Sequence, residues 1–386
     1  MSNGTESFMD IPFHKPAIGE EEIRAVTDCL RNGWLTMGGR TVEFEELFAR
    51  RLGVRFAVAV NSGTAALHLA LLAAGVSAGC EVIVPAMTFV STAEVVRYLG
   101  AQPVLADVDP NTFLLDAEKI ESKITAKTKA IIPVHYGGCP CDMDAINAVA
   151  KKYNLFVIED AAHSLPAFYK GKPAGTLGQA GCFSFYATKT LATGEGGMIA
   201  TDNEEWATLA RSLRLHGITK DAWKRYTKDG NWRYDVLANG FKYNMTDISA
   251  AIGIEQLKKL NALNDKRRVL AERYTAAFAG KRGLIPYEVP VGADSSWHLY
   301  PLKVDSAASA ISRDVLADRL KEQGIMTSVH FIPLYRFTTY KDEWQSKDFP
   351  GCEQAFATEL SLPMFPDLSF GEQDEIIKSI LALSGN

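Results

Sequence analysis

Short apolar runs alternate with amphipathic segments along residues 56–202 of the chain. Each run has the length of a β-strand, is rich in Val, Ile, Phe or Ala, and is largely apolar on both faces. The runs cover residues 56–60, 81–85, 103–108, 130–134, 155–158, 181–185 and 197–201. The segments between them have helical periodicity and cover residues 65–74, 92–99, 116–124 and 143–153. Strands buried on both faces and separated by helices predict an α/β domain with a mainly parallel seven-stranded sheet between helices.

A different organisation is expected after residue 203. A predicted helix at 204–213 precedes a long, irregular segment, 216–244, that is rich in aromatic and basic residues. A long helix or helix pair is then predicted from about residue 246 to 279, ending at Gly280. At 1.5 Å per residue it would extend on the order of 50 Å, which is enough to connect one domain to the next.

The C-terminal part has the pattern of a small α+β domain. Its predicted elements are a strand at 297–304, a helix capped by Ser312, a strand at 325–331, and a helix after Ser369 with Glu372 completing a capping box. We therefore expect a large α/β domain at residues 1–250. The linking helix and the small domain are expected at residues 251–386.

Composition and charge exclude several classes of protein. The 386 residues are 47% hydrophobic and 23% charged, as in a soluble protein with a large core. Forty-one Lys and Arg against 46 Asp and Glu give a net charge of −5, which argues against a chain-wide basic surface. There is no sign of a signal peptide and no run of roughly 20 apolar residues. We expect a cytoplasmic protein without a membrane or nucleic-acid partner.

The six cysteines fit reduced, mostly buried thiols better than a disulfide framework. Cys139 and Cys141 are separated by a single residue, which is too close for ordinary zinc-ligand spacing, and no second pair accompanies them. We therefore expect no metal site.

A lysine follows the predicted strand 181–185 within the segment GCFSFYATKTLATGEGG. Lys189 is thereby placed at the carboxyl edge of the sheet, where ligands gather in such folds. The glycines that follow it, Gly194 to Gly197, allow backbone to pack closely around a ligand. Burial lowers the pKa of a lysine and makes it a candidate Schiff-base nucleophile. The alternative interpretation is an exposed loop lysine.

An acidic pair follows the apolar run 155–158 in the segment LFVIEDAAHS. Asp160 is expected to point into the same crevice, where a carboxylate needs a cationic partner. The protonated ring nitrogen of pyridoxal phosphate (PLP) is one such partner. A salt bridge or a helix N-cap is the alternative.

A third candidate is the segment VNSGTAAL, in which a strand leads through Ser62, Gly63 and Thr64 into a helix. Orphan N–H groups and the positive end of the helix would suit a phosphate there. An ordinary Ser/Thr helix cap is the alternative. The segment lacks the lysine of a P-loop and the spacing of a dinucleotide fingerprint, which argues against an NTPase or a Rossmann dehydrogenase.

In chain order, these segments supply a phosphate-binding turn, an acid for a ring nitrogen and a Schiff-base lysine. Each follows a strand of the same predicted sheet. With them the chain resembles the DegT/DnrJ/EryC1/StrS family of PLP-dependent sugar aminotransferases, which have the aspartate aminotransferase fold (fold type I). The resemblance is greatest to enzymes that aminate carbon 4 of a UDP-linked 4-keto pentose. The matching segments are GWLT (33–36), NSGTAAL (61–67), PAMTFVST (85–92), VHYGG (134–138), IEDAAH (158–163), residues 184–197, GFKYNMTD (240–247) and WHLY (297–300).

The resemblance implies a role for each matching residue toward the cofactor. Lys189 bonds to the cofactor aldehyde and later moves the proton, Asp160 pairs with the pyridinium nitrogen, and Phe89 stacks on the ring face. His163 lies near the cofactor hydroxyl. The phosphate is held by Ser62, Gly63, Thr64 and Ser184, joined by Asn244 of the neighbouring subunit.

Two positions depart from the family pattern. Close relatives often have Trp at the position of Phe89, and stacking survives that change. Many members have Gln where His163 stands, so a structural histidine is the alternative interpretation there.

Substrate contacts are expected from three parts of the chain. Residues 220–242 carry six basic side chains against three acidic ones, with Trp and Tyr interleaved, which suits a nucleotide diphosphate. A solvated or dimer-packing loop is the alternative. The candidates are Arg225 and Tyr226 in this segment, Trp34 and Leu35 in the N-terminal segment, and His330 in the small domain. His135 and His298 are expected to be structural.

The lysine also separates branches of the family, because a branch that dehydrates sugars at carbon 3 has His at the position of Lys189. Transamination is therefore expected, from L-glutamate, released as 2-oxoglutarate, to a nucleotide-linked (UDP) 4-keto sugar for cell-surface polysaccharide, lipopolysaccharide or glycan synthesis. The alternatives are a 3-keto sugar aminotransferase acting on a dTDP- or UDP-sugar, a PLP-dependent elimination or desulfuration, and a non-catalytic PLP-binding regulatory protein. Asn244 acting across an interface implies a homodimer with shared active sites.

Overall fold

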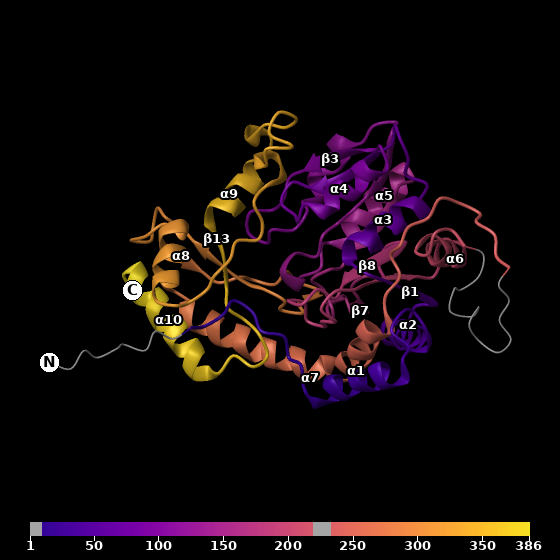
Figure 1. Ribbon diagram of the computed structural model, residues 1–386. Helices are drawn as coiled ribbons and strands as arrows, with labels where there is room; N and C mark the ends of the chain where they lie inside the picture. Colours follow the sequence, from indigo (N-terminus) through magenta and orange to yellow (C-terminus); the bar gives the residue numbers. More distant parts are fainter. Residues whose placement is uncertain (1–9, 219–232) are drawn as a thin grey trace.

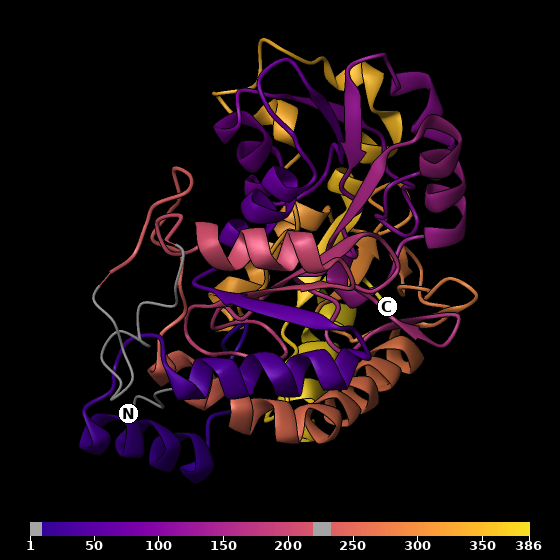
Figure 2. The ribbon, with the colours of Figure 1, turned by 90° about the vertical axis from the view of Figure 1, so that its right-hand side faces the viewer.

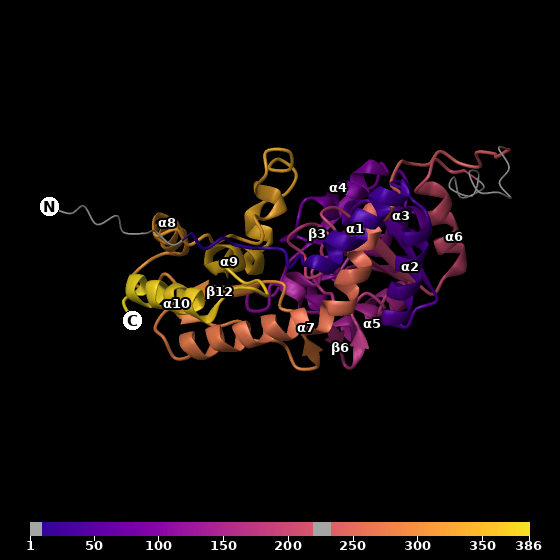
Figure 3. The same cartoon turned by 60° about the horizontal axis from the view of Figure 1, so that its bottom comes forward.

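A computed structural model of the chain describes residues 10–218 and 233–386. An α/β part with a central sheet lies beside a smaller C-terminal part, and the long helix α7 (Asp247–Phe278) runs along both (Figure 1). Seen from below, α7 extends from the α/β part to the C-terminal helices (Figure 3). The predicted long linking helix is therefore confirmed as a single helix of 32 residues.

The central sheet has seven strands in the order β1-β9-β8-β5-β4-β2-β3. Strand β9 is antiparallel to both of its neighbours, whereas β8, β5, β4, β2 and β3 are parallel to one another. All seven predicted runs form its strands, so the prediction of a mainly parallel sheet is confirmed. The strands are β1 (Phe56–Val60), β2 (Glu81–Pro85), β3 (Gln102–Ala106), β4 (Thr128–Ile131), β5 (Phe156–Asp160), β8 (Ala180–Ser184) and β9 (Gly197–Thr201).

Both faces of this sheet are buried, because successive side chains of a strand point to opposite sides. Val58 and Val60 of β1 pack in a core with α3 (Gly63–Ala73), α4 (Ser91–Tyr98), α5 (Met143–Tyr153) and α6 (Glu204–Leu213). Ala57 and Ala59 face the other core, which α2 (Gly39–Leu52) and the first half of α7 cover. Figure 2 shows α6 on one side of the sheet and α1, α2 and α7 on the other.

The prediction of a helix at 116–124 is wrong. The structure has only two 3-10 turns there, η1 (Ala117–Lys119) and η2 (Glu121–Lys123). Ile120, between the two turns, is fully buried, but no residue of either turn is. A single apolar anchor does not offset the cost of starting a helix.

Two helices precede the sheet in a region to which the sequence assigned no element, α1 (Glu20–Asn32) and α2. Both pack on α7. The carboxylate of Asp247, the first residue of α7, accepts hydrogen bonds from the backbone N–H groups of Gly38, Arg40 and Thr41. It thereby caps the start of α2 from more than 200 residues away in the sequence, a contact that only the tertiary structure reveals.

The C-terminal part contains a three-stranded antiparallel sheet, β10 (Leu284–Ile285), β12 (Tyr300–Val304) and β13 (Glu359–Leu362). Helices α8 (Arg313–Glu322) and α10 (Phe370–Ser384) pack on it together with the second half of α7. The predicted caps at Ser312 and Ser369, including the capping box, are confirmed. The remaining elements are α9 (Pro350–Thr358), η3 (Tyr136–Gly138), η5 (Leu334–Arg336), η6 (Ser346–Asp348) and the sheet of β6 (Phe168–Tyr169), β7 (Lys172–Pro173) and β11 (Ala293–Asp294).

The prediction of a strand at 325–331 is wrong. This segment forms only isolated bridges, from Ile325 to Ile11 and from Ser328 to Ser361 of β13. The backbone N–H of His330 bonds to a side chain instead of a neighbouring strand, as described below. Because Ile11 is also part of the C-terminal core, the N-terminal segment crosses between the two parts. The boundary at residue 250 lies within α7 and stays a prediction.

Three further features bear on the expected class of protein. None of the described helices is long and apolar enough to cross a membrane. In the described ranges no cluster of three or more His, Cys, Asp or Glu has a geometry suited to a metal ion. All six cysteines are free, and five of them are buried, which confirms the prediction of mostly buried thiols.

Candidate active site

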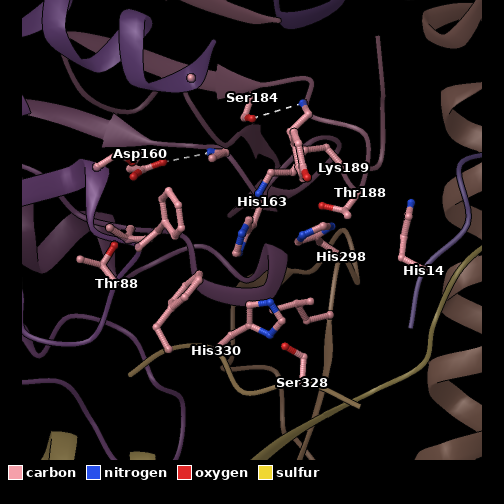
Figure 4. Close-up of a pocket in the computed structure, with 18 of the residues that line it drawn as sticks. His14, Thr88, Asp160, His163, Ser184, Thr188, Lys189, His298, Ser328 and His330 are labelled. Atoms are coloured by element: carbon pink, nitrogen blue, oxygen red, sulfur yellow. Dashed lines mark hydrogen bonds between the residues drawn. The ribbon is translucent and has the colours of Figure 1, made fainter. Parts of the chain in front are cut away.

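A cavity of about 450 Å³ lies at the carboxyl ends of the sheet strands, between the sheet and the C-terminal part. Its sheet side is lined by residues that follow β1, β2, β5 and β8. Its opposite side is lined by residues 298–299, by Ser328, His330 and Phe331, and by Leu362 at the end of β13 (Figure 4). The sequence-predicted residues that line it are Ser62, Gly63, Thr64, Phe89, Asp160, His163, Ser184, Lys189 and His330. The fold thus brings into one pocket side chains separated by more than 260 residues.

Lys189 lies in the loop that follows β8, with its side chain in the pocket (Figure 4). Burial lowers the pKa of its amine from 10.5 to about 8, although the carboxylate of Asp160 acts in the opposite direction. Gly197, which begins β9 after this loop, lies so close to Ser62 that an added Cβ would be 2.4 Å from the Ser62 carbonyl carbon. Close packing of these glycines around a ligand stays a prediction, whereas the lowered pKa leaves the lysine with a partly neutral amine.

Asp160 ends β5 on the sheet side of the pocket and is almost fully buried. Its Oδ2 accepts a hydrogen bond of 2.9 Å from the Thr92 hydroxyl, which lies 2.9 Å from the Thr88 hydroxyl. Its Oδ1 accepts from the backbone N–H of Ala162 at 3.2 Å. Burial raises the pKa of Asp160, and the bond from Thr92 and the charge of Lys189 oppose this. The carboxylate is held in one orientation and has room for a further cationic donor.

The two threonines that orient Asp160 were missed as functional residues. Both lie in the segment PAMTFVST (85–92), which matches the family. That match assigned no role to either hydroxyl. Nothing in the sequence shows that Thr92 bonds to Asp160 or Thr88 to Thr92, because Thr92 follows β2 and Asp160 ends β5, with β4 between these strands.

The start of α3 forms the third wall of the pocket. Ser62 is the N-cap, and its Oγ accepts a hydrogen bond from the Ala65 N–H at 3.0 Å. Among the described residues, no acceptor pairs with the backbone N–H groups of Gly63 and Thr64. A Cβ on Gly63 would lie 2.9 Å from the Cβ of Ser184, so only glycine fits there without a shift. Two unpaired N–H groups, a helix N-terminus and the Ser184 hydroxyl are suited to a phosphate.

Four imidazoles line the side of the pocket that faces Lys189: His14, His163, His298 and His330. Burial is the largest cause that lowers the pKa of each, and the positive charge of Lys189 acts in the same direction. For His14 and His330 the pKa falls to about 3. The wall is therefore uncharged at neutral pH, and it can donate and accept hydrogen bonds.

His298 and His135, both expected to be structural, lie differently relative to the pocket, and the expectation stays a prediction for each. His298 lines the pocket, its ring centroid is 4.3 Å from that of His163, and its buried Nδ1 has no hydrogen-bond partner within the described parts of the chain. His135 is fully buried outside the lining and bonds through Nε2 to Glu159 at 2.9 Å. Glu159 also accepts three backbone N–H bonds, so this pair holds the connection between β5 and β8.

These residues fit PLP. The open N-terminus of α3 suits its phosphate, Asp160 suits its ring nitrogen, and Lys189 supplies an amine with a lowered pKa for its aldehyde. The comparison with protein families decides the matter, because the DegT/DnrJ/EryC1/StrS aminotransferase family model matches residues 16–381. This chain belongs to the DegT/DnrJ/EryC1/StrS aminotransferase family. The resemblance predicted from the sequence is therefore confirmed.

Two curated proteins and several solved structures are similar over nearly the whole chain. MJ1066 of Methanocaldococcus jannaschii, a protein without a characterised function, is 47% identical over 97% of both chains. The spore coat polysaccharide biosynthesis protein SpsC of Bacillus subtilis is 46% identical over 96% of both. The PLP-form of Spr1654 of Streptococcus pneumoniae, described as a sugar aminotransferase, is 36% identical with a TM-score of 0.91, covering 98% of this chain and 99% of that one. The chain is thus a fold type I aminotransferase with PLP as its cofactor.

Some expected residues of this aminotransferase are not part of the pocket. Asn244 lies outside the lining, where its amide oxygen accepts from Lys242 at 2.6 Å. Trp34 and Leu35 do not reach the pocket of their own chain either, because the Trp34 indole donates to the carbonyl of Met37 between α1 and α2. Arg225 and Tyr226 lie outside the described residues.

Phe89 lies at the mouth of the pocket. Its side chain is 57% exposed, and its ring centroid is 6.1 Å from that of Phe331. The position permits stacking on a planar ligand, which stays a prediction.

Proposed function

We propose that this aminotransferase transfers the amino group of L-glutamate to carbon 4 of a nucleotide-linked 4-keto sugar, with UDP as the nucleotide, in the synthesis of a cell-surface polysaccharide or glycan. The observation that carries the proposal is the placement of Lys189 and Asp160 in one pocket with the open N-terminus of α3. Lysine at 189, in place of histidine, supports transamination over dehydration. The names of SpsC and Spr1654 support a sugar substrate and a polysaccharide product.

The uncharged wall of the pocket supports a sugar as the acceptor. The four imidazoles and the hydroxyl of Ser328 offer both donors and acceptors, which match the hydroxyls of a sugar ring. Asp160 and Glu195 are the two carboxylates in the described lining, and Asp160 is already oriented by Thr92. The hydroxyls of the sugar would therefore be bound by the neutral imidazoles and by Ser328. These neutral groups do not repel the negatively charged nucleotide.

The protein supplies orientation, charge and a proton carrier. PLP, when bound, withdraws electrons from the bonds at the substrate carbon next to the amine. Asp160 would hold the ring nitrogen protonated, and the two threonines keep its carboxylate in place. The neutral amine of Lys189 would accept the α-carbon proton of glutamate at Nζ and would then pass that proton to the bound cofactor, which leaves the amine neutral again. A pKa of about 8 suits both uptake and release of the proton near neutral pH.

A glutamate-dependent assay tests this proposal. The enzyme is loaded with PLP and incubated with L-glutamate and either a UDP-4-keto pentose, a dTDP-4-keto hexose or a dTDP-3-keto hexose, and 2-oxoglutarate is measured. NMR of the product then identifies the aminated carbon. We expect the fastest release with the UDP-4-keto pentose and amination at carbon 4. Preferred amination at carbon 3, or turnover with none of the sugars, would contradict the proposal.

The matched control for this assay is Lys189→Ala. Because the proposed phosphate contacts are on α3 and at Ser184, away from the Lys189 amine, we expect this variant to retain PLP while losing turnover. Normal turnover by the variant would contradict the role of the lysine. PLP retention without turnover in the wild-type protein would instead favour a regulatory protein.

A desulfuration or elimination reaction is less well supported. Desulfuration requires an accessible, ionisable cysteine over the cofactor. Cys182 is the cysteine nearest to Lys189 in the sequence, but it is buried in β8, and burial raises its thiol pKa well above the ordinary value. No cysteine is among the described residues that line the pocket.

We further propose that the active enzyme is a homodimer in which each subunit completes the other's site. Phe89 and Tyr186, both at the pocket, are 57% and 48% exposed, so part of the pocket wall is open in one chain. Asn244 lies outside its own pocket, which leaves it available to the neighbouring one. A second copy would cover the exposed rings and add the missing phosphate donor.

A further inference from the structure

A buried acid lies behind the pocket in the C-terminal part. Glu359, the first residue of β13, has no exposed surface, and neither has Ser361 two residues later. The Ser361 hydroxyl donates to Glu359 Oε1 at 2.5 Å, and the backbone N–H of His330 donates to Glu359 Oε2 at 2.8 Å. Both carboxylate oxygens are thus acceptors in fixed bonds, and one of the donors is a backbone group that cannot reverse its role.

The same serine connects the acid to the pocket. The Oγ of Ser361 lies 2.9 Å from Nδ1 of His330, and the ring of His330 faces the pocket between Ser328 and His163 (Figure 4). A hydroxyl has one proton to donate. Because Ser361 donates that proton to Glu359, its oxygen accepts from His330, so Nδ1 carries the imidazole proton.

We propose that Glu359, acting through Ser361, fixes the tautomer of the neutral His330 imidazole so that its unprotonated Nε2 is presented to the pocket as an acceptor. Among the described residues, none forms a hydrogen bond with this Nε2. Burial keeps the ring neutral, with its pKa lowered to about 3. Glu359 and Ser361 are positioning residues, because neither lines the pocket itself.

The inference identifies the kind of group that binds at this point. An unprotonated Nε2 accepts a hydrogen bond from a hydroxyl or an ammonium group, and it repels a carbonyl or a phosphate oxygen. This part of the inference rests on the proposed function, in which the group is a hydroxyl of the sugar. His330 would then favour sugars that carry a free hydroxyl at this position over deoxy sugars, since a binding group left without its partner is costly.

The tautomer depends on the charge of Glu359. Burial raises the pKa of this carboxyl to about 7, and the groups that oppose this are the Ser361 hydroxyl, the His330 N–H, the Tyr136 side chain and the charge of Arg313. The Tyr136 hydroxyl itself falls short of hydrogen-bond geometry. When Glu359 gains a proton, it donates to Ser361, which frees the serine proton for Nδ1. The ring of His330 then carries its proton on Nε2.

The isosteric variant Glu359→Gln tests the arrangement without removing volume. The His330 N–H requires an acceptor, so the amide oxygen of glutamine takes the place of Oε2 and its NH₂ group faces Ser361. The serine proton is then donated to Nδ1, and the imidazole proton moves to Nε2. Glu353→Gln is the matched control, since Glu353 bonds to Tyr335 and Arg336 instead and has no contact with His330.

The experiment is NMR of cofactor-loaded enzyme labelled with ¹⁵N-histidine, without substrate, in which the chemical shifts of the two ring nitrogens distinguish the tautomers. His330→Gln identifies the relevant signals. We expect Nδ1–H in the wild type and in Glu353→Gln at pH 8, and Nε2–H in Glu359→Gln or in the wild type below the pKa of Glu359. An Nε2–H tautomer in the wild type at pH 8, or an unchanged tautomer in folded Glu359→Gln, would overturn the inference.

Kinetics then show what the tautomer does. Loss of one matched hydrogen bond should lower kcat/KM of Glu359→Gln for the keto sugar by about tenfold. The half-reaction with L-glutamate should keep its rate, which a general structural defect would not do. Equal losses in both half-reactions would overturn the recognition role. If no keto sugar is turned over by the wild type, the proposed function fails, whereas the tautomer result stands by itself.

Discussion

The lowered pKa of Lys189 permits a direct physical test. The perturbation is a change of pH on the cofactor-free enzyme, with Asp160→Asn as the variant. With a pKa of about 8, roughly one lysine in ten is neutral at pH 7, whereas an amine with the ordinary value of 10.5 is neutral in roughly one of 3,000 molecules. The structure therefore predicts roughly 300-fold more reactive amine at position 189 than at an unperturbed lysine.

The assay is trace acetylation over a range from about pH 6 to pH 11, with the extent of labelling at each lysine read by peptide mass spectrometry. Reactivity of Lys189 should fall as the pH drops through about 8, because the amine gains its proton there. Lys152 and Lys170 are internal controls: their ion pairs with Glu121 and Asp144 raise their pKa values, so they should react only at higher pH. Asp160→Asn should move the midpoint of Lys189 lower, since the carboxylate raises it.

Two results would refute this reasoning. If Lys189 titrates together with Lys152 and Lys170, its burial in the pocket does not destabilise the charged form. If Asp160→Asn leaves the midpoint unchanged or raises it, the two side chains are not electrostatically coupled, and the pocket geometry is not the one described.

Three further predictions concern the site, the assembly and the fold. Thr92→Val should lower kcat by about tenfold while PLP still binds, because Asp160 loses its oriented donor; an unchanged kcat in steady-state assays would contradict this. Mixing inactive Lys189→Ala with Asn244→Ala should restore activity in about a quarter of the sites, since half of the dimers are mixed and each has one intact site; a mixture no more active than its parts would exclude shared sites. Glu45→Ala should lower the free energy of unfolding by about 3–5 kcal/mol in urea denaturation, because it leaves the buried guanidinium of Arg214 unpaired, and a loss below 1 kcal/mol would contradict that pairing.

The sequence by itself determined the sheet, the long helix and the three parts of the cofactor site. Apolar runs of strand length are informative because the sheet buries both faces, so each strand lacks the polar alternation of an exposed one. Lys189, Asp160 and the Ser62–Thr64 turn were identified because each directly follows such a run, and the carboxyl ends of neighbouring strands meet at one edge. The family resemblance added the roles and the expected substrate.

Other features were decided only by the tertiary structure. A helix needs several buried anchors, and the segment around Ile120 has one, so it forms 3-10 turns where the pattern predicts a helix. Hydrogen bonds between distant segments leave no periodic signal, which is why the orientation of Asp160 by Thr92 and the contact of Glu359 with His330 were not predicted. The pKa shifts could not be predicted from the sequence for a related reason: they are caused mainly by burial, and burial depends on which distant segments pack around a side chain.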